Sequence, residues 1–423
     1  MQVTIVTVGS RGDVQPYVAL GAGIQAAGHH VRLATHTTFE SLVCTHGLEF
    51  FPVGGDPRRT LEGRAGQDWT EADSNFMSFM SRMLSATGSS IYDMLSGFWD
   101  ACQETELLIF PVLPAIGLVS IAEKLGIPSF PAYLQHVHPT RSYPSAMIAP
   151  VPRLGGLYNR LTYPLGTQIF WQFLRRETNK WRRKTLGLSP YPFFSPFGSW
   201  LKERWPTLYG FSPQVVPKPP EWGDEVHITG YWFLNADPDW APPRELAAFL
   251  EAGPPPVFIG FGSMTDRDPQ QVAALAAAAL KRAGQRGLLL SGWAGMSIPD
   301  LPPHLFILDY APFDWLFPRM AAVVHHGGAG TTATGLRAGV PSLVVPFFGD
   351  QFFWGWRVQT LGAGPAPLPR RKLSVELLGA AIEEAVRDPE IRARAAQLGR
   401  RIRAENGVEA AVQALQAHGA LRP

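Results

Sequence analysis

A run of histidine, glycine and threonine residues at positions 325–332 has the composition of a turn that binds a diphosphate. Residues 321–324 before it are apolar and predict a short strand, and residues 331–338 predict a helix that ends at Gly339. Unpaired backbone N–H groups at the start of a helix favour an anion, and glycines let phosphate oxygens approach the main chain. The contacts that we predict are His326, Gly328, Ala329, Gly330 and Thr331.

Two other interpretations of this run are weaker. A plain tight turn also uses glycine, but it does not need the histidines, the threonines or the Asp350-Gln351 pair that follows. The adjacent His325 and His326 lack further metal ligands at suitable spacing, and no Gly-Lys-Thr sequence follows as in a Walker loop. Asp350 and Gln351 offer acceptors and donors that suit the hydroxyls of a sugar.

The elements around these residues alternate between strand and helix patterns. Strand patterns at 3–8, 31–35 and 49–53 alternate with helix patterns at 15–27 and 38–46, and similar alternation resumes from residue 257. Such alternation predicts parallel strands with crossover helices, and therefore an α/β chain with two Rossmann-like domains.

The domain boundary is predicted by a Pro-rich stretch at residues 235–256. We expect residues 1–234 to form the first domain and 235–404 the second, with a last helix near 405–420 packing back on the first. The Gly9–Asp13 loop and the 325–332 run both follow predicted strands. Because ligands of open parallel sheets bind at the carboxyl ends of strands, we expect the two to face one another.

The composition is that of a globular protein. With 46% hydrophobic residues and a net charge of +2, the chain of 423 residues can bury large cores and gives no electrostatic case for nucleic acid. Cys44 and Cys102 make neither a disulfide framework nor a zinc site. The longest apolar stretch, 107–122, is too short for a bilayer span. The sequence opens without a signal-like segment, so we expect a cytoplasmic protein.

Several motifs, in this order, resemble the family 1 glycosyltransferases of GT-B architecture. The similarity is greatest to the sterol glucosyltransferase-like group, followed by bacterial enzymes that glycosylate antibiotic aglycones. The motifs are Gly9-Ser10-Arg11-Gly12-Asp13-Val14-Gln15-Pro16, Phe261-Gly262-Ser263, Asp314-Trp315-Leu316-Phe317-Pro318, the histidine-glycine run, and Pro346-Phe347-Phe348-Gly349-Asp350-Gln351. The resemblance implies two Rossmann-like domains that face each other across a cleft, the first binding the acceptor and the second the nucleotide sugar.

The resemblance also implies roles for single residues. The aspartate that matches Asp13 is the general base for the acceptor hydroxyl, and helix capping is the alternative role of this residue. In the second domain Ser263 would contact a phosphate and Trp293 the base. The remaining donor contacts are Ser10, Arg11 and Gly12 in the first loop, Tyr310, Ala311 and Phe313 near the base, and Asp350 and Gln351 at the sugar.

The implied reaction is inverting transfer of a hexose from a UDP-sugar or TDP-sugar to a hydroxyl of a lipophilic small acceptor, such as a sterol or polyketide-like aglycone. Backbone amides, His326 and Thr331 can stabilise the leaving diphosphate, so we expect no metal or other cofactor. The Asp-x-Asp patterns at 237–239 and 266–268 suit a linker and a helix start instead. Two alternatives are a sugar-nucleotide 2-epimerase-like isomerase and a non-catalytic sugar-nucleotide-binding module.

Residues 130–233 follow no regular pattern and are rich in proline and aromatic residues. They predict either the wall of an apolar acceptor pocket or ordinary core and loops. Tyr133, His136 and His138 are the acceptor-site candidates. The basic segment 175–184 predicts a helix whose apolar side either joins the core or contacts an anionic membrane. The sequence predicts no oligomeric state.

Overall fold

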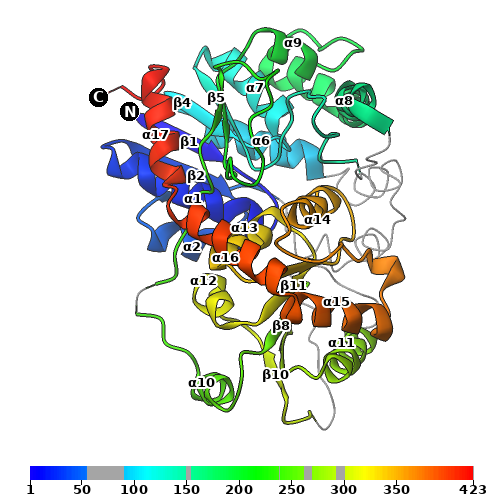
Figure 1. Cartoon of the computed structure of the whole chain (residues 1–423). Helices are drawn as coiled ribbons and strands as arrows, with labels where there is room; N and C mark the ends of the chain where they lie inside the picture. Colours follow the sequence, from blue (N-terminus) through cyan, green and yellow to red (C-terminus); the bar gives the residue numbers. More distant parts are fainter. Residues whose placement is uncertain (55–89, 149–153, 238, 262–268, 292–300, 423) are drawn as a thin grey trace. The chain divides into compact units, whose positions relative to one another are not determined.

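The computed structural model describes residues 1–54, 90–148, 154–237, 239–261, 269–291 and 301–422. These residues form two compact units (Figure 1). The chain passes from the first unit to the second between Leu234 and Asn235 and returns to the first between Ala404 and Glu405. Each unit is built on one parallel sheet, so the predicted fold class of two Rossmann-like α/β domains is confirmed.

The strands of the first unit form a sheet of seven in the order β3-β2-β1-β4-β5-β6-β7. Ile5 of β1 pairs with Leu33 of β2 and Ile109 of β4. The strand order reverses between β1 and β4, and ligands of such sheets bind at this point. The bounds are β1 Gln2–Val6, β2 His30–Thr35, β3 Glu49–Pro52, β4 Leu107–Phe110, β5 Ser129–Tyr133, β6 Thr207–Tyr209 and β7 Val226–Ile228.

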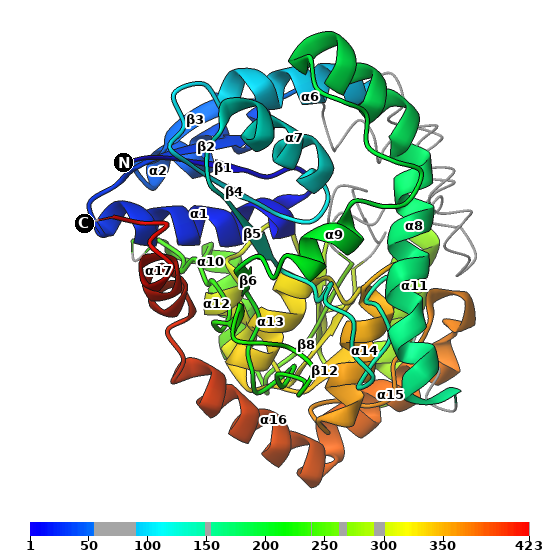
Figure 2. The same cartoon turned by 90° about the horizontal axis from the view of Figure 1, so that it is seen from above.

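Helices cover both faces of this sheet, which explains why β4 is apolar at every position. Leu107 and Ile109 share a core with residues of α1 and α17, whereas Leu108 and Phe110 share another with residues of α6, α7 and α8 (Figure 2). The helices of the unit are α1 Arg11–Ala26, α2 Glu40–Thr45, α6 Ser90–Ala101, α7 Ala115–Leu125, α8 Gly155–Trp181, α9 Phe197–Lys202 and α17 Gly407–Ala417, with a 3-10 turn at Thr37–Phe39 and a π-helical turn at Arg182–Leu186.

The last helix, α17, packs against α1. Ala411 and Leu415 are fully buried in the core that holds Val18 of α1. A side chain at Gly23 of α1 would begin 2.2 Å from a methyl carbon of Val408, so the glycine permits the close approach of the two helices. The return of the chain is also held by Glu405, whose Oε1 accepts a hydrogen bond from the Ser212 hydroxyl at 2.7 Å.

The region with no regular pattern contains α8, a helix of 27 residues. The structure decides between the two interpretations of its basic end, because Trp171 and Trp181 are fully buried and the apolar side there joins the core. Arg182 is also buried. It donates to Glu123 at 2.9 Å and lies 3.7 Å from the centre of the Tyr191 ring.

The strands of the second unit form a parallel sheet of five in the order β10-β9-β8-β11-β12. Ile259 lies in a core with residues of α11 and α15, and its neighbour Phe258 in another with residues of α10 and α12. The strands are β8 Val257–Gly260, β9 Gly287–Leu290, β10 Leu305–Leu308, β11 Ala322–His325 and β12 Ser342–Val344. The helices are α10 Arg244–Glu251, α11 Pro269–Ala283, α12 Phe313–Leu316, α13 Ala329–Ala338, α14 Gln351–Thr360, α15 Val375–Arg387 and α16 Pro389–Arg403, with 3-10 turns at Phe317–Arg319 and Arg370–Lys372.

Candidate active site

The predicted strand, glycine turn and helix at residues 321–339 are present in the second unit. The helix α13 begins at Ala329, two residues before the predicted start, and ends at Gly339 with φ of +76°. Gly327 has φ of +91°, and a Cβ there would lie 2.6 Å from Val344 Cγ1 and 3.0 Å from the backbone oxygen of Gln351. Only glycine fits this position, because both the backbone angle and the space exclude a side chain.

Both histidines of the turn are neutral at physiological pH. Burial and the neighbouring His326 lower the pKa of His325 to about 3, and its Nδ1 accepts a hydrogen bond from the Gly327 N–H at 3.1 Å. Burial lowers the pKa of His326 to about 4. A Cβ on Gly328 would lie 2.5 Å from Nε2 of His326, so this glycine makes room for the ring beside the helix start.

The first turn of α13 offers hydrogen-bond donors to an anion. Among the described residues no side chain caps this helix, and its first turn holds no acidic residue. Nδ1 of His326 is buried and has no partner within the described part of the chain. Thr332 is tied to the carbonyl of Gly328 at 2.9 Å, whereas the half-buried Thr331 makes no such bond to a described residue. These groups can together hold a phosphate oxygen.

The Asp350-Gln351 pair begins α14, beside the glycine turn. Oε1 of Gln351 accepts hydrogen bonds from the backbone N–H groups of Phe347 and Phe348 at 2.8 and 3.2 Å. Oδ2 of Asp350 accepts one from the indole of Trp354 at 2.9 Å. The amide oxygen of Gln351 therefore shapes its own loop, and Asp350 is the half-exposed member of the pair.

The other predicted donor residues lie farther along the sheet. Tyr310 and Ala311 follow β10, which is three strands away from β11, or about 14 Å at the usual strand spacing. Tyr310 is exposed and Ala311 buried, while Phe313 stacks on Phe317 at 4.5 Å between ring centres. Ser263 and Trp293 lie outside the described residues.

In the first unit, Asp13 occupies the third position of α1. Its Oδ2 accepts hydrogen bonds from the backbone N–H and the hydroxyl of Ser10, at 2.8 and 2.9 Å. Oδ1 has no hydrogen-bond partner among the described residues. Burial raises the pKa of this carboxyl, and the two bonds from Ser10 oppose that rise. The residue therefore stabilises the helix start through Oδ2 alone, and a carboxylate oxygen in the position of Oδ1 is able to accept a proton.

The rest of the loop after β1 is held by His36, a residue that no sequence motif singled out. The N–H of Gly9 donates to Nε2 of the buried His36 at 3.2 Å. His36 directly follows the predicted strand at 31–35, and its position at the carboxyl end of that strand could have marked it as a site residue. Arg11, a predicted diphosphate contact, is exposed and donates to Gln15 at 3.0 Å. Gly12 is exposed beside it.

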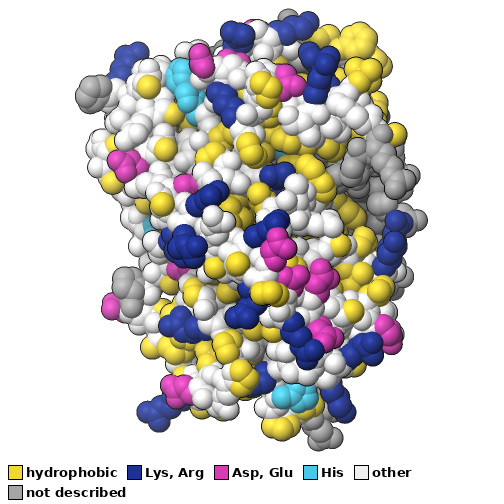
Figure 3. Space-filling model, viewed as in Figure 1, with side chains coloured by type: hydrophobic (Ala, Val, Ile, Leu, Met, Phe, Trp, Pro, Cys, Tyr) yellow, Lys and Arg dark blue, Asp and Glu magenta, His cyan; other side chains and the backbone are white. Residues whose placement is uncertain are grey.

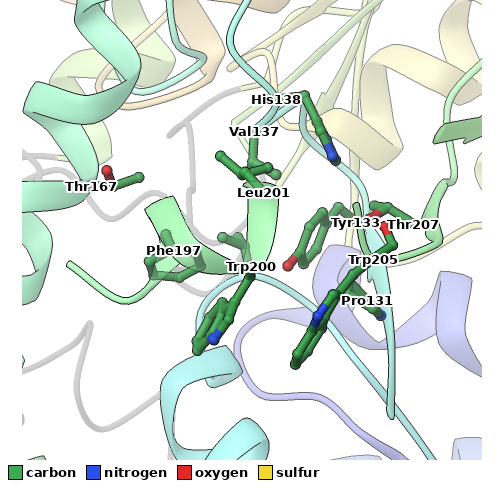
Figure 4. Close-up of a pocket in the computed structure, with 11 residues that line it drawn as sticks. Pro131, Tyr133, Val137, His138, Thr167, Phe197, Trp200, Leu201, Trp205 and Thr207 are labelled. Carbon is green, nitrogen blue, oxygen red and sulfur yellow. Dashed lines mark hydrogen bonds between the residues drawn. The ribbon is translucent and has the colours of Figure 1, made fainter. Parts of the chain in front are cut away.

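Tyr133 and His138 line an apolar pocket within the first unit, between β5, α8 and α9 (Figure 4). The hydroxyl of the deeply buried Tyr133 has no hydrogen-bond partner in the described ranges. Tyr209 accepts hydrogen bonds from the N–H groups of Val137 and His138, so it donates its own proton to Nδ1 of His138 at 2.6 Å. His138 therefore carries its proton on Nε2, and burial lowers its pKa to about 4.

The pocket is small in this conformation. Its cavity volume of about 40 Å³ is far below the roughly 300–1,000 Å³ of usual small-molecule sites. Trp200 and Trp205 stack on each other at one side of it. His136, the third candidate, is absent from the lining residues. Its Nε2 bonds to the carbonyl oxygen of Pro144 at 2.9 Å, and its ring packs on Tyr143.

Two features are absent from the described residues. No group of three His, Cys, Asp or Glu side chains is placed to hold a metal ion. In the same residues no helix has both the length and the apolar character needed to span a bilayer.

Two family models match the chain. Residues 3–144 match the glycosyltransferase family 28 N-terminal domain, and residues 290–417 match the C-terminal domain of the erythromycin biosynthesis protein CIII-like proteins. Among solved structures, the glycosyltransferase SsfS6 of Streptomyces sp. SF2575, complexed with thymidine diphosphate, is similar with a TM-score of 0.65. That match covers 99% of each chain at 20% identity, and it shows the shared fold.

Curated relatives align over almost all of the chain. A sterol 3-beta-glucosyltransferase of Emericella nidulans is 41% identical over 98% of this chain, which spans only 30% of that relative. A sterol 3-beta-glucosyltransferase of Arabidopsis thaliana is 39% identical over 99% of this chain and 68% of the relative. The chain therefore belongs to the glycosyltransferase family that includes the sterol 3-beta-glucosyltransferases.

Proposed function

We propose that this protein transfers a hexose from a UDP-sugar or TDP-sugar to a hydroxyl of a lipophilic small acceptor, with inversion at the anomeric carbon. The observation that carries the proposal is the uncapped start of α13, where glycine backbone and the unpaired Nδ1 of His326 meet. An anion is the ligand that such a site favours. In a chain of this family, the diphosphate of a nucleotide sugar supplies that anion.

On the donor side, the diphosphate binds at the N–H groups of Ala329 and Gly330, with His326 and Thr331 as further donors. The thymidine diphosphate in the SsfS6 complex supports a nucleoside diphosphate as ligand of this fold. Asp350 accepts hydrogen bonds from sugar hydroxyls. The nucleoside extends along the strand ends toward Tyr310, a distance of about 14 Å.

The chemical step is one displacement. The acceptor oxygen bonds to the anomeric carbon as the bond from that carbon to the diphosphate oxygen breaks, and Oδ1 of Asp13 takes the hydroxyl proton. A positioned base contributes roughly two to four orders of magnitude to such a step. The electron pair stays on the leaving diphosphate, and the fixed N–H groups of α13 and neutral His326 stabilise its charge. Because the attack comes from the face opposite the leaving group, the configuration inverts.

The pocket beside β5 supports a lipophilic acceptor. Its lining is mainly apolar, with Tyr133 and the Nε2–H of His138 as hydrogen-bond donors. An acceptor larger than solvent would displace Trp200 or Trp205, because the present cavity is too small to hold it. In this role His138 orients an acceptor oxygen and does not act as a base, since its Nδ1 accepts the proton of Tyr209 and its Nε2 already carries one.

The test combines the purified protein with UDP-glucose or TDP-glucose and a panel of sterol, polyketide and flavonoid alcohols, and detects products by mass. We expect a mass increase of one hexose on a lipophilic alcohol. Conversion of the donor sugar without any acceptor would support an isomerase instead. Donor binding with neither transfer nor hydrolysis would support a binding module. Full activity in the presence of a chelator is expected, because no step requires a metal.

A further inference from the structure

The first half of α8 exposes a row of leucines. Leu157, Leu161 and Leu165 follow one another at four-residue spacing, and Leu154 lies one turn before them. Residues three and four apart share one face of a helix. These four side chains are 54 to 67% exposed. They form an apolar stripe about 16 Å long on the surface of the first unit.

The stripe continues into a pair of exposed phenylalanines. Gln168 and Gln172, three and seven residues after Leu165, both donate hydrogen bonds to the carbonyl oxygen of Phe193, at 3.2 and 2.7 Å. Phe193 and Phe194 are 56 and 73% exposed, and their rings meet edge to face. We call the four leucines and two phenylalanines the apolar ridge. They are six of the twelve large hydrophobic side chains that are exposed in the described ranges.

The ridge lies in the most basic part of the chain. Residues 154–202 contain eight Lys and Arg and one Glu, a net charge of +7 in a chain whose total is +2. The guanidinium of Arg175 lies 5.3 Å from the centre of the Phe193 ring, and the side chain of Arg176 is 94% exposed. Figure 3 shows hydrophobic side chains gathered over the segment that leads into α9, with Lys and Arg side chains on the same face.

We propose that the apolar ridge and the surrounding cations bind the surface of an anionic lipid bilayer. Leucine and phenylalanine side chains enter the boundary between headgroups and acyl chains, and Arg and Lys contact lipid phosphates. This combination favours lipid over other partners. Nucleic acid would match the charge but not the exposed leucines, and an ordinary protein interface would not need the excess of positive charge.

The ridge and the apolar pocket share the same two helices. Thr167 of α8 lines the pocket two residues after Leu165, and Phe197, Trp200 and Leu201 of α9 line it shortly after Phe194 (Figure 4). A lipophilic molecule dissolved in the bilayer would therefore meet the pocket at the membrane surface. Bilayer binding itself goes beyond the proposed sugar transfer, because it requires neither donor nor acceptor.

The experiment measures flotation of the protein with vesicles of phosphatidylcholine alone or mixed with phosphatidylglycerol, without donor or acceptor. We expect binding to the mixed vesicles, weakened by salt, and at most weak binding to phosphatidylcholine. The triple variant Leu157→Gln, Leu161→Gln, Leu165→Gln should lose binding by about tenfold or more. The matched control is Leu113→Gln, Leu301→Gln, Leu377→Gln, which changes three leucines that are 38 to 49% exposed elsewhere.

A charge pair of variants tests the second half of the proposal. Arg176→Glu with Lys184→Glu should weaken binding to the mixed vesicles by about tenfold or more, whereas Arg392→Glu with Arg400→Glu on α16 should not. Equal binding by the ridge variant and its control would overturn the proposal, as would absence of binding to both vesicle types. So would a dimer in lipid-free solution that the ridge variant dissolves. Circular dichroism and UDP binding verify the fold of every variant, so a failure of sugar transfer would not be mistaken for a failure of lipid binding.

Discussion

The loop after β1 and the turn after β11 have the same backbone arrangement, but only the first is followed by a helix with a carboxylate in its first turn. In both, a central parallel strand leads through a glycine with positive φ, Gly9 or Gly327, into a helix. In both, the N–H of that glycine donates to a ring nitrogen of a buried histidine, His36 or His325. The difference lies three residues into the helix.

The third helical position holds Asp13 in α1 and Thr331 in α13. The first turn of α1 therefore contains its own carboxylate, bound by Ser10, while that of α13 has no internal anion among the described residues. Since a helix start attracts negative charge, a start that already holds a carboxylate can supply a base, and one that holds none can bind an external phosphate. This one helical position therefore separates the base that we propose for α1 from the phosphate site that we propose for α13.

The largest expected effect comes from removing the internal anion. Asp13→Asn keeps the shape of the side chain and an oxygen that accepts from Ser10, but it cannot take a proton. We expect the kcat of transfer to fall by about two to four orders of magnitude, with the Kd of UDP-glucose changed less than about twofold. Ser10→Ala is the control, because it removes one of the hydrogen bonds to Oδ2 and leaves the carboxylate. Unchanged transfer in Asp13→Asn would exclude this residue as the base.

Placing a carboxylate in the first turn of α13 should weaken its binding of the donor. Thr331→Asp gives α13 the carboxylate that α1 has, and like charges near 4 Å repel by about 2 to 4 kcal/mol at an effective dielectric constant of 20 or somewhat more. Calorimetry should show donor binding weakened by roughly 30-fold to 1,000-fold. The thermal stability should stay level or rise, because the helix start gains a favourable charge. Thr331→Asn, which is neutral, should weaken binding much less; equal losses in the two variants would contradict the electrostatic account.

Alanine substitutions of the two positive-φ glycines should impair different properties of the protein. Gly327→Ala places a Cβ against Val344 and the backbone of Gln351, so we expect a loss of about 1–3 kcal/mol in the free energy of unfolding and weaker donor binding. Gly9→Ala places a Cβ 2.5 Å from Oδ2 of Asp13, so the transfer rate should fall more than donor affinity. Gly284→Ala, with φ of +64° and open space around it, measures backbone strain alone. The account fails if Gly327→Ala is no more harmful than this control.

Much of this design could be predicted from the sequence. The runs of apolar residues, the glycines and the order of strand and helix patterns specify both Rossmann-like sheets, and α2 and α13 have nearly the predicted bounds. Periodicity works there because each helix buries one side on a sheet. Residues 155–174 of α8 escaped it, because Pro164 and several glycines interrupt the pattern and the first half of the helix leaves leucines exposed. Only the basic end, from residue 175, was predicted to be helical.

Candidate residues could be predicted where neighbours in the sequence form one loop. Contacts between residues that are far apart in the sequence could not be predicted. The contact of Gly9 with His36 joins two strands, and sequence spacing does not reveal which histidine would reach which loop. Likewise, the commitment of the Gln351 oxygen to Phe347 and Phe348 depends on the shape of one loop. The pairing of His138 with Tyr209, which fixes the tautomer of the histidine, joins residues 71 positions apart.

The smallest expected effect is a difference in how the two turns respond to pH. The pKa values of His325 and His326, about 3 and about 4, lie below the 6.5 of a free histidine. At a pH between the lowered values and 6.5, the unfolded chain therefore binds more protons than the folded protein. The free energy of unfolding should therefore fall as pH drops below about 6.5, by at most about 1.4 kcal/mol per pH unit for each histidine. His326→Gln should reduce that slope in urea unfolding.

Over the same range the transfer rate and the donor affinity should separate. Burial raises the pKa of Asp13, so its carboxyl gains a proton on acidification before an ordinary aspartate would, and the rate falls as the base is lost. His326 stays neutral until pH nears 4, and UDP-glucose keeps its charge, so the Kd of the donor should hardly change between pH 7 and about 5. A donor affinity that rises on acidification would mean that a protonated His326 binds the diphosphate. The first turn would then no longer be the only one of the two that changes protonation in this pH range.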